Sequence, residues 1–320
     1  MPAKLNLQLA VGPPRADGYH DLVTVFHAVS LFDEITVTPA GRDAVTVAGE
    51  GADRVPAGPD NLALRAVAAL RAAVAAPAAA TGVRIAITKR IPVAAGLAGG
   101  SADAAAALVA CNVLWGRSLG QPQLLEVAAR VGSDVSFALL GGTAVGRGRG
   151  ERLTPALAPA TPYHWVLAFA DGHLSTPEVY ATLDRLRAAA SVSARGRAAG
   201  RGGAAPRNRA RAGTAAPGLD AALMSALRSG DARQLGRALS NDLQPAALSL
   251  FPALRKTLAA GLELGALGAL VAGSGPTCAF LAASADRALD LAASLSGAGV
   301  CRSVARVSGP VPGAAVVAAR

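Results

Sequence analysis

The sequence predicts an α+β protein built from two domains, and three observations support this prediction. The chain of 320 residues can bury a sizeable core, and its length suits two domains better than one. Its N-terminal region is rich in β-branched residues and alternates in polarity, which is typical of antiparallel strands. Beyond about residue 158 a second series of strands and alanine-rich helices begins. We therefore expect domains at 1–158 and 159–320, with a cleft between them.

The first domain is expected to start with strands and continue with helices. KLNLQLAV alternates like a half-buried strand, and DLVTVFHAVSLFDEITVTP extends the β-structure through a turn near 32–33. DNLALRAVAALRAAV has helical spacing, with Asp60 placed to cap it. GVRIAITKRIP is a strand that ends at Pro92. We then expect a loop at 93–100, a helix at 101–115, a helix in QPQLLEVAARVG, and a turn with two strands in SDVSFALLGGTAVGRGRGERL.

The second domain is expected to mix strands and helices after a proline-rich connector at 155–162. YHWVLAFAD, LGALVAG, TCAFLAA and VCRSVARV have the composition of strands. Helices are predicted at 177–190, at several places within 219–262, and near 285–295. We find no internal repeat.

One segment, 191–217, differs from the rest of the chain. It contains no acidic residue, lacks apolar periodicity and is rich in Gly, Ala and Arg, so we expect a disordered insertion. It accounts for much of the net charge of +10. No aromatic residue is interleaved for base stacking, so nucleic acid is not an expected partner, although RNA association through this segment stays open as an alternative. Its arginines are Arg195, Arg197, Arg201, Arg207, Arg209 and Arg211.

Other whole-chain features exclude further classes of protein. No uninterrupted run of about 18 apolar residues is present, so no membrane span is expected. Residues after Met1 do not resemble a signal peptide. Cys111, Cys278 and Cys301 are odd in number and widely spaced, which fits neither a disulfide framework nor a zinc site. We expect a cytoplasmic protein with reduced thiols.

The stretch IPVAAGLAGGSADAAAALVACNVLWG places glycines and a serine between a predicted strand and a predicted helix. A helix N-terminus exposes unpaired N–H groups and the positive end of its dipole, and glycines let a phosphate approach the backbone. The spacing matches neither the dinucleotide fingerprint nor the P-loop. Taken alone, the stretch is either a phosphate-binding loop or a flexible turn before an alanine-rich core helix.

Three motifs in order point to a known family. They are PAKLNLQL at 2–9, P-x-x-x-G-L-x-G-G-S at 92–101 and VAGSGPTCAF at 271–280. Together they resemble the three motifs of the GHMP kinase superfamily. RADGYHDL at 15–22, with DNL, VGSDVSF and GRGERL, resembles one branch of that superfamily.

The resemblance implies both a fold and an activity. The implied fold has an N-terminal domain like the second domain of ribosomal protein S5 and a ferredoxin-like C-terminal domain, with the active site between them. The implied reaction moves the γ-phosphoryl group of ATP onto the 2-hydroxyl of diphosphocytidyl-methylerythritol, in the non-mevalonate route to isoprenoids. Another GHMP kinase, such as homoserine kinase, is the alternative. RADGYH argues against it, because a cytidine-reading element has no use there.

The same resemblance assigns the catalytic pair. Asp134 is the implied base, or the group that orients the acceptor hydroxyl, and Lys4 is its partner. Phosphoryl transfer depends mostly on positioning and charge stabilisation, which a lysine beside an aspartate can supply. From spacing alone, Asp134 would be read as a helix or turn cap and Lys4 as a solvated charge.

The remaining implied contacts belong to the two substrates. Tyr19 and His20 are expected at the cytosine, and Tyr180 is expected to complete a sandwich around it, although a structural histidine and a core tyrosine are the simpler interpretations. ATP is expected at the glycine loop, with Mg²⁺ bridging its phosphates and Ser101 as a phosphate or magnesium contact. No acidic metal ligand stands out. The other implied substrate contacts are Asn6, Thr176, Gly273 and Ser274, and the ATP contacts are Pro92, Val93, Ala94, Ala95, Gly96, Leu97, Ala98, Gly99, Gly100, Ser101, Ala102, Asn61 and Lys89.

The chain departs from the family pattern at three positions. Ala95 and Ala98 stand where the family loop commonly has glycine, so the backbone there is expected to avoid positive φ. Ser136 replaces a proline after the catalytic aspartate, which is expected to loosen Asp134. The expected protein binds two small molecules, is a monomer or weak homodimer, and has no nucleic-acid or membrane partner.

Overall fold

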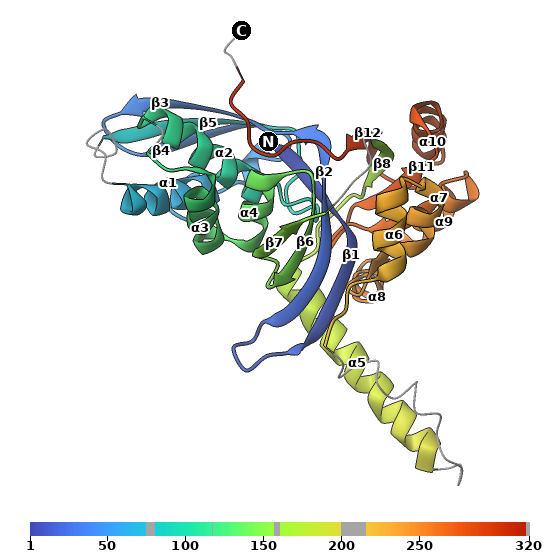
Figure 1. The fold of residues 1–320 in the computed structure, drawn as a ribbon. Helices are drawn as coiled ribbons and strands as arrows, with labels where there is room; N and C mark the ends of the chain where they lie inside the picture. Colours follow the sequence, from blue (N-terminus) through green and yellow to red (C-terminus); the bar gives the residue numbers. More distant parts are fainter. Residues whose placement is uncertain (75–80, 117, 157–160, 200–215, 318–320) are drawn as a thin grey trace.

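The computed structural model describes residues 1–74, 81–116, 118–156, 161–199 and 216–317, without the side chains of 193–199. Figure 1 shows a long β-hairpin through the middle of the molecule, with one group of helices on each side. The two strands of the hairpin are β1 (Pro2–Pro14) and β2 (His20–Phe32). They therefore lie at the junction of the two halves.

The hairpin belongs to a five-stranded sheet of order β7-β6-β2-β1-β9. Strands β1 and β2 are antiparallel, with Lys4 opposite Ala28. At the far edge β9 runs parallel to β1, so the second half of the chain contributes a strand to the first sheet. The remaining strands are β6 (Thr143–Gly148), β7 (Arg152–Pro155) and β9 (Ser240–Asn241).

A three-stranded sheet of order β3-β5-β4 carries the helices of the first half. In β5 the buried residues alternate with exposed ones, as in a strand with one face on the core, and this alternation places Lys89 on the buried face. The elements are β3 (Glu34–Ala40), β4 (Ala44–Gly49), β5 (Gly82–Lys89), α1 (Leu62–Ala73), α2 (Gly99–Leu114), α3 (Gln121–Val131) and α4 (Ser133–Leu140), with a short 3-10 helix η1 (Ala52–Arg54).

The second half has an antiparallel sheet of order β10-β11-β8-β12. Helix α5 (Thr176–Ala199) follows β8 and extends away from the body of the molecule (Figure 1). The other elements are β8 (Tyr163–Phe169), α6 (Ala221–Ser229), α7 (Ala232–Ala238), α8 (Gln244–Leu250), α9 (Leu254–Glu263), β10 (Gly268–Val271), β11 (Cys278–Ala282), α10 (Ala285–Gly297) and β12 (Ser303–Gly309).

Apolar packing joins the halves. One buried cluster includes Leu5 of β1, Ile85 of β5 and Trp165 of β8. Between β2 and β8 the fully buried His27 lies 6.0 Å from the rings of both Tyr163 and Trp165. The two halves therefore share one packed core.

Several expectations about local structure need correction. Ser133–Leu140 is helix α4 rather than a turn. Asn61, not Asp60, caps α1, because its side-chain oxygen accepts the N–H of Ala63. Helix α5 continues to Ala199, so 191–199 are helical and not part of a loop. The rest of the predicted insertion lies mainly in 200–215, outside the described residues, as does the predicted boundary at 158.

Candidate active site

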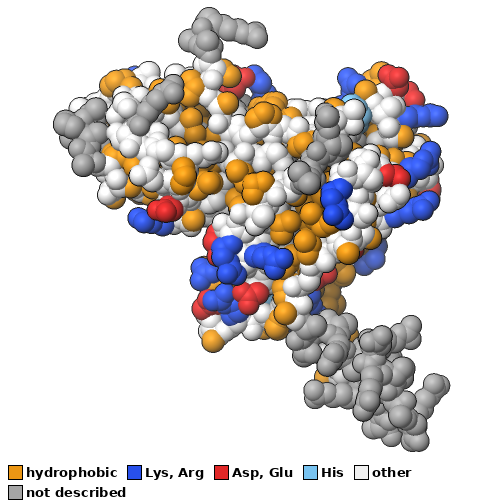
Figure 2. Space-filling model, in the orientation of Figure 1, with side chains coloured by type: hydrophobic (Ala, Val, Ile, Leu, Met, Phe, Trp, Pro, Cys, Tyr) orange, Lys and Arg blue, Asp and Glu red, His pale blue; other side chains and the backbone are white. Residues whose placement is uncertain are grey.

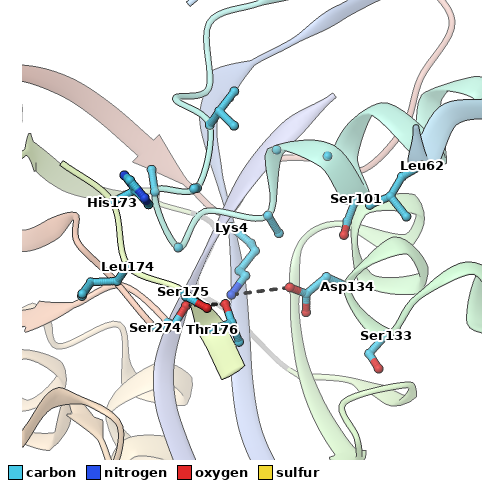
Figure 3. A pocket seen from close by; sticks show the side chains of 18 of the residues that line it. Lys4, Leu62, Ser101, Ser133, Asp134, His173, Leu174, Ser175, Thr176 and Ser274 are labelled. Atoms are coloured by element: carbon cyan, nitrogen blue, oxygen red, sulfur yellow. Dashed lines mark hydrogen bonds and ion pairs between the residues drawn. The ribbon is translucent and has the colours of Figure 1, made fainter. Parts of the chain in front are cut away.

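A cleft of about 840 Å³ lies between the two halves. Its walls come from β1 and β2, the loop at 92–98 with the start of α2, the start of α4, and residues 173–180 and 273–274 of the second half. Most of the residues that the sequence analysis selected contribute to its lining. Figure 3 shows this cleft with Lys4 and Asp134 facing each other across it.

Lys4 and Asp134 form the central ion pair of the cleft. The Lys4 Nζ atom lies 3.7 Å from Asp134 Oδ2, and 33% of the Asp134 side chain is exposed (Figure 3). Lys4 itself is buried on β1, and Asp134 lies in the first turn of α4. A helix N-terminus favours a carboxylate, so α4 both places Asp134 and suits its charge. Because both residues line the cleft, a polar group in the cleft could approach the two side chains together.

A chain of hydrogen bonds holds the Lys4 amine. Lys4 Nζ donates to Asn6 Oδ1 at 2.6 Å, and Asn6 Nδ2 donates to Thr24 Oγ1 at 2.8 Å. Thr24 in turn donates to the carbonyl of Gln8 at 2.7 Å. All these groups belong to the β1–β2 hairpin, so Asn6 orients the lysine from its own strand. The Lys4 backbone N–H also donates to Leu97 O, which ties β1 to the glycine loop.

The glycine loop ends at the N-terminus of α2, which begins at Gly99. The first turn of a helix has N–H groups without intrahelical acceptors, and the Ala98 side chain does not cap them. The expectation that the alanines here avoid positive φ is wrong for Ala98, whose φ is 59°. Ala94 also has a positive φ, 55°. A left-handed alanine costs about 1–2 kcal/mol, so surrounding contacts must hold this backbone in place.

The third sequence motif, at 271–280, supplies such contacts. A Cβ added to Gly96 would overlap the carbonyl oxygen of Ala272 and lie 3.0 Å from Gly275 N. One added to Gly273 would lie 3.0 Å from Gly96 O and 3.4 Å from Lys4 Nζ. The two motifs therefore meet backbone to backbone, and only glycine permits this approach.

The second half contributes hydroxyl groups and a ring. The hydroxyls of Thr176 and Ser274 lie 2.8 Å apart at the start of α5. Tyr180 lines the cleft one turn further along, where burial, with Asp134 adding to it, raises the pKa of its hydroxyl to about 12. Thr176 and Ser274 lie across the cleft from Asp134 (Figure 3).

Tyr19 and His20 do not reach the cleft in this structure. Among the described residues that line it, neither is present. His20 is buried behind Tyr180, with ring centroids 5.1 Å apart, and its Nε2 lies 3.0 Å from Asp184 Oδ1. Tyr19 is 54% exposed.

Arg149 covers the Tyr19 ring and is a cleft residue that the sequence analysis did not select. Its guanidinium carbon lies 3.9 Å from the ring centroid, and it pairs with Asp17 at 3.2 Å. Figure 2 shows basic and acidic side chains gathered over this end of the β1–β2 hairpin. The signal available in the sequence was an arginine between two glycines, in a motif quoted only for its resemblance.

Asn61 and Lys89 both line the cleft beneath the loop, but their side chains already have partners. Asn61 caps α1 and donates to Pro56 O at 2.8 Å. Lys89 Nζ donates to Asp103 Oδ2 at 2.8 Å and to Asp33 Oδ2. Neither aspartate was selected from the sequence.

Neither a metal-binding cluster nor a membrane-spanning helix is present in the part of the chain that the structure describes. No group of three or more His, Cys, Asp or Glu side chains there could hold a metal ion. No helix there is both long and apolar enough to cross a membrane.

Comparison with known proteins shows the class first. Residues 61–142 match the N-terminal domain of the GHMP kinases and residues 223–301 match their C-terminal domain. A crystal structure of homoserine kinase from Cytophaga hutchinsonii shares this fold, with a TM-score of 0.69 and 20% identity, covering 98% of this chain and 95% of that one. The predicted two-domain GHMP kinase fold is confirmed.

Closer relatives narrow the class. The chain is 54% identical to the 4-diphosphocytidyl-2-C-methyl-D-erythritol kinase of Thermobifida fusca, over 99% of this chain and 97% of the relative. It is 51% identical to the enzyme of that name from Mycobacterium tuberculosis, over 100% of this chain and 92% of the relative. A crystal structure of a 4-(cytidine 5'-diphospho)-2C-methyl-D-erythritol kinase aligns with a TM-score of 0.70 and 32% identity, covering 96% and 97% of the two chains. The chain belongs to this kinase family.

Proposed function

We propose that the protein transfers the γ-phosphoryl group of ATP to the 2-hydroxyl of 4-diphosphocytidyl-2-C-methyl-D-erythritol, giving the 2-phosphate and ADP for isoprenoid synthesis by the non-mevalonate route. Family membership supports this reaction over the homoserine kinase alternative. Relatives that are 50–55% identical over nearly the whole chain are named 4-diphosphocytidyl-2-C-methyl-D-erythritol kinase.

The observation that carries the proposal is the Lys4–Asp134 pair beside the glycine loop. Asp134 is partly exposed to the cleft, and its carboxylate and the Lys4 amine, 3.7 Å apart, both line the cleft, so an acceptor hydroxyl beside the pair could contact both. In a loose transition state the carboxylate orients the hydroxyl and accepts its proton late. The Lys4 amine, fixed by Asn6, then lies where negative charge on the transferring group would need a cation.

On the nucleotide side, the first turn of α2 would receive the ATP phosphates through its free N–H groups. Gly99 and Gly100 let the phosphates approach the backbone, and the hydroxyl of Ser101 lines the same surface. The adenine would lie towards Asn61 and Leu62, where the cleft continues beyond the loop. Asn61 would contribute there by shaping the wall, since its side chain caps α1.

On the acceptor side, the substrate carries a diphosphate and a cytosine. Arg149 is the cleft-lining cation nearest the Tyr19 end and is 46% exposed at its side chain, so it is suited to the diphosphate. Tyr180 offers a ring for the base, with His20 packed behind it. Tyr19 would join the site if Arg149 left its ring for the diphosphate.

Magnesium would arrive with ATP and would offset the charge of its phosphates. Mg²⁺ keeps several waters and is commonly held by substrate phosphates with one or two protein groups. The Ser101 hydroxyl is suited to such a contact, whereas Asp103, although it lines the cleft, is committed to Lys89.

The location, oligomeric state and partners of the enzyme are also part of the proposal. We propose a cytoplasmic enzyme that acts as a monomer or weak homodimer on two small molecules. The RNA alternative rests on residues that lie mainly outside the described structure, and nothing in the cleft requires it.

The test is release of ADP by the purified protein with a panel of acceptors. We expect turnover with diphosphocytidyl-methylerythritol and less than about a hundredth of that k cat/KM with homoserine or mevalonate, because only the first fills the cytidyl end. Comparable turnover with homoserine would overturn the proposal.

A further inference from the structure

Three charged side chains are buried next to the glycine loop. Lys89, Asp33 and Asp103 have side-chain exposures of 2%, 0% and 5%. The Lys89 amine bonds both carboxylates. Charges are buried so completely only where each is paired, so this cluster is a built feature of the fold.

The three residues bracket the loop. Lys89 is the last residue of β5, immediately before the loop, and Asp103 lies in the second turn of α2, immediately after it. Lys89 and Asp103 are 14 positions apart in the chain, and their contact closes the chain between them into a ring. Asp33, between β2 and β3, holds the two residues that lead from β5 into the loop. Its Oδ1 accepts the N–H groups of Arg90 at 2.6 Å and Ile91 at 2.9 Å.

The amine also lies directly beneath the phosphate end of α2. A Cβ added to Gly99 would come within 3.0 Å of Lys89 Nζ. A cation at a helix N-terminus opposes the helix dipole, and the two carboxylates offset that effect. Without Lys89, two carboxylates would remain under the place where ATP brings its own negative charge.

We propose that Lys89 is a positioning residue for ATP: through Asp33 and Asp103 it ties β5 to α2 across the glycine loop and holds the loop in its phosphate-binding form. This rests on the proposed function, since it takes the loop as the ATP phosphate site. In this proposal Lys89 acts on ATP through the position of the loop and does not touch the nucleotide itself.

The cluster also explains how the loop holds its strained backbone. Ala94 and Ala98 both have positive φ, and both lie within the ring that Lys89 and Asp103 close. Closing a loop at both ends removes the extended conformations that would relieve such strain. Opening the ring would therefore release these alanines and misplace the N–H groups of α2.

The first test compares Lys89→Met and Asp103→Leu with the wild-type full chain. Each variant should raise the KM for ATP about tenfold or more, since misplacement by about 1 Å is enough for such losses, and leave the KM for the cytidyl substrate within about twofold. In the double variant the two effects should combine to less than their product, because both open the same ring. Lys256→Met, on an exposed face of α9, is the matched control and should change neither constant.

A second variant and a second readout guard against simple loss of folding. Asp103→Asn keeps an oxygen for the Lys89 amine, so its KM for ATP should stay within about threefold of wild type. Amide hydrogen exchange at 95–101 should be faster in Lys89→Met and Asp103→Leu than in wild type, without ATP present.

Three results would overturn the proposal. An unchanged KM for ATP in Asp103→Leu, with a raised one in Lys89→Met, would mean that Lys89 contacts ATP itself. Equal increases in both KM values would mean a general structural role. Unchanged exchange at 95–101 in both variants would contradict the loop-holding role, and this readout does not depend on the acceptor substrate. Failure of the wild-type protein to use the cytidyl substrate would instead count against the proposed function alone.

Discussion

Two lysines lie beside the glycine loop, and their surroundings differ. Lys4 faces the cleft, 3.7 Å from a carboxylate that is one-third exposed. Lys89 is sealed between two buried carboxylates, in direct hydrogen bonds. An open pair, whose carboxylate is exposed to the cleft, can be reached by a substrate group and is suited to chemistry, whereas a closed pair, whose carboxylates are buried, is suited to holding structure. The tasks proposed for the two lysines thus differ because the fold gives them different partners.

The largest expected effect comes from removing the carboxylate of the open pair. Asp134→Asn should lower k cat about 10²–10⁴-fold, the usual contribution of a positioned general base, with little change in the free energy of unfolding. Steady-state ADP release checks this. Asp286→Asn is the matched control, since Asp286 also lies in the first turn of a helix but outside the cleft. Activity within threefold of wild type in Asp134→Asn would remove Asp134 from the mechanism.

The two lysines themselves should show opposite patterns. Lys4→Met should reduce k cat about 10²-fold, because it removes a cation from the transferring group, and should destabilise the fold by only about 1–3 kcal/mol through the unpaired Asn6. Lys89→Met should cost about 3–5 kcal/mol of unfolding free energy, as expected when one partner of a buried pair is removed. Urea unfolding and initial rates measure both. The same pattern in both variants would erase the distinction between open and closed pairs.

A third buried group, His27, has no charged partner and should respond to pH. Burial lowers its pKa from 6.5 to about 4. The unfolded chain takes up a proton at higher pH than the folded protein, so stability should be full above about 6.5 and fall as pH drops towards 4, by about 3 kcal/mol. In His27→Gln this fall should shrink by that amount, as measured by urea unfolding at several pH values. His164→Gln on β8 is the control, and an identical pH slope in His27→Gln and wild type would show that His27 does not contribute.

How much of this could be predicted from sequence depends on the distance between partners. The alternation in β5 and the residues within each of the three motifs are local in sequence, and the strand and the GHMP family were predicted from them. The partners of Lys89 are not local, since Asp33 is 56 residues away in the chain. No periodicity could have paired them, and the expectation of a nucleotide contact at Lys89 came from the family resemblance alone.

Local readings also failed where tertiary contacts decide the backbone. Ala98 adopts a left-handed conformation although alanine disfavours it, in a loop where Gly96 packs on Ala272. Ser133–Leu140 carries glycines on both flanks and resembled a turn, yet its buried Val135 and Phe137 make it a short helix. Tyr19 and His20 are neighbours in the sequence yet differ in their surroundings, Tyr19 being exposed and His20 buried against Tyr180, so their expected place at the cytosine stays a prediction.

The smallest expected effect concerns the strained alanine. Ala98→Gly should relieve the strain of the positive φ, because glycine adopts this angle readily. The free energy of unfolding should change by no more than about 1 kcal/mol, because this relief is offset by the greater freedom of glycine in the unfolded chain. The KM for ATP should stay within about twofold of wild type. Thermal unfolding and ATP saturation curves check both, and a large loss of ATP affinity would mean that the alanine methyl group itself contributes to binding.

The most direct measurement of the central claim is ³¹P NMR of the wild-type reaction with ATP and diphosphocytidyl-methylerythritol. The proposed function predicts ADP together with one new phosphomonoester signal, on a product whose diphosphate signals remain. Asp134→Asn should give almost none of that signal over the same time. Release of inorganic phosphate alone, or loss of the cytidyl diphosphate signals, would contradict phosphoryl transfer to the 2-hydroxyl.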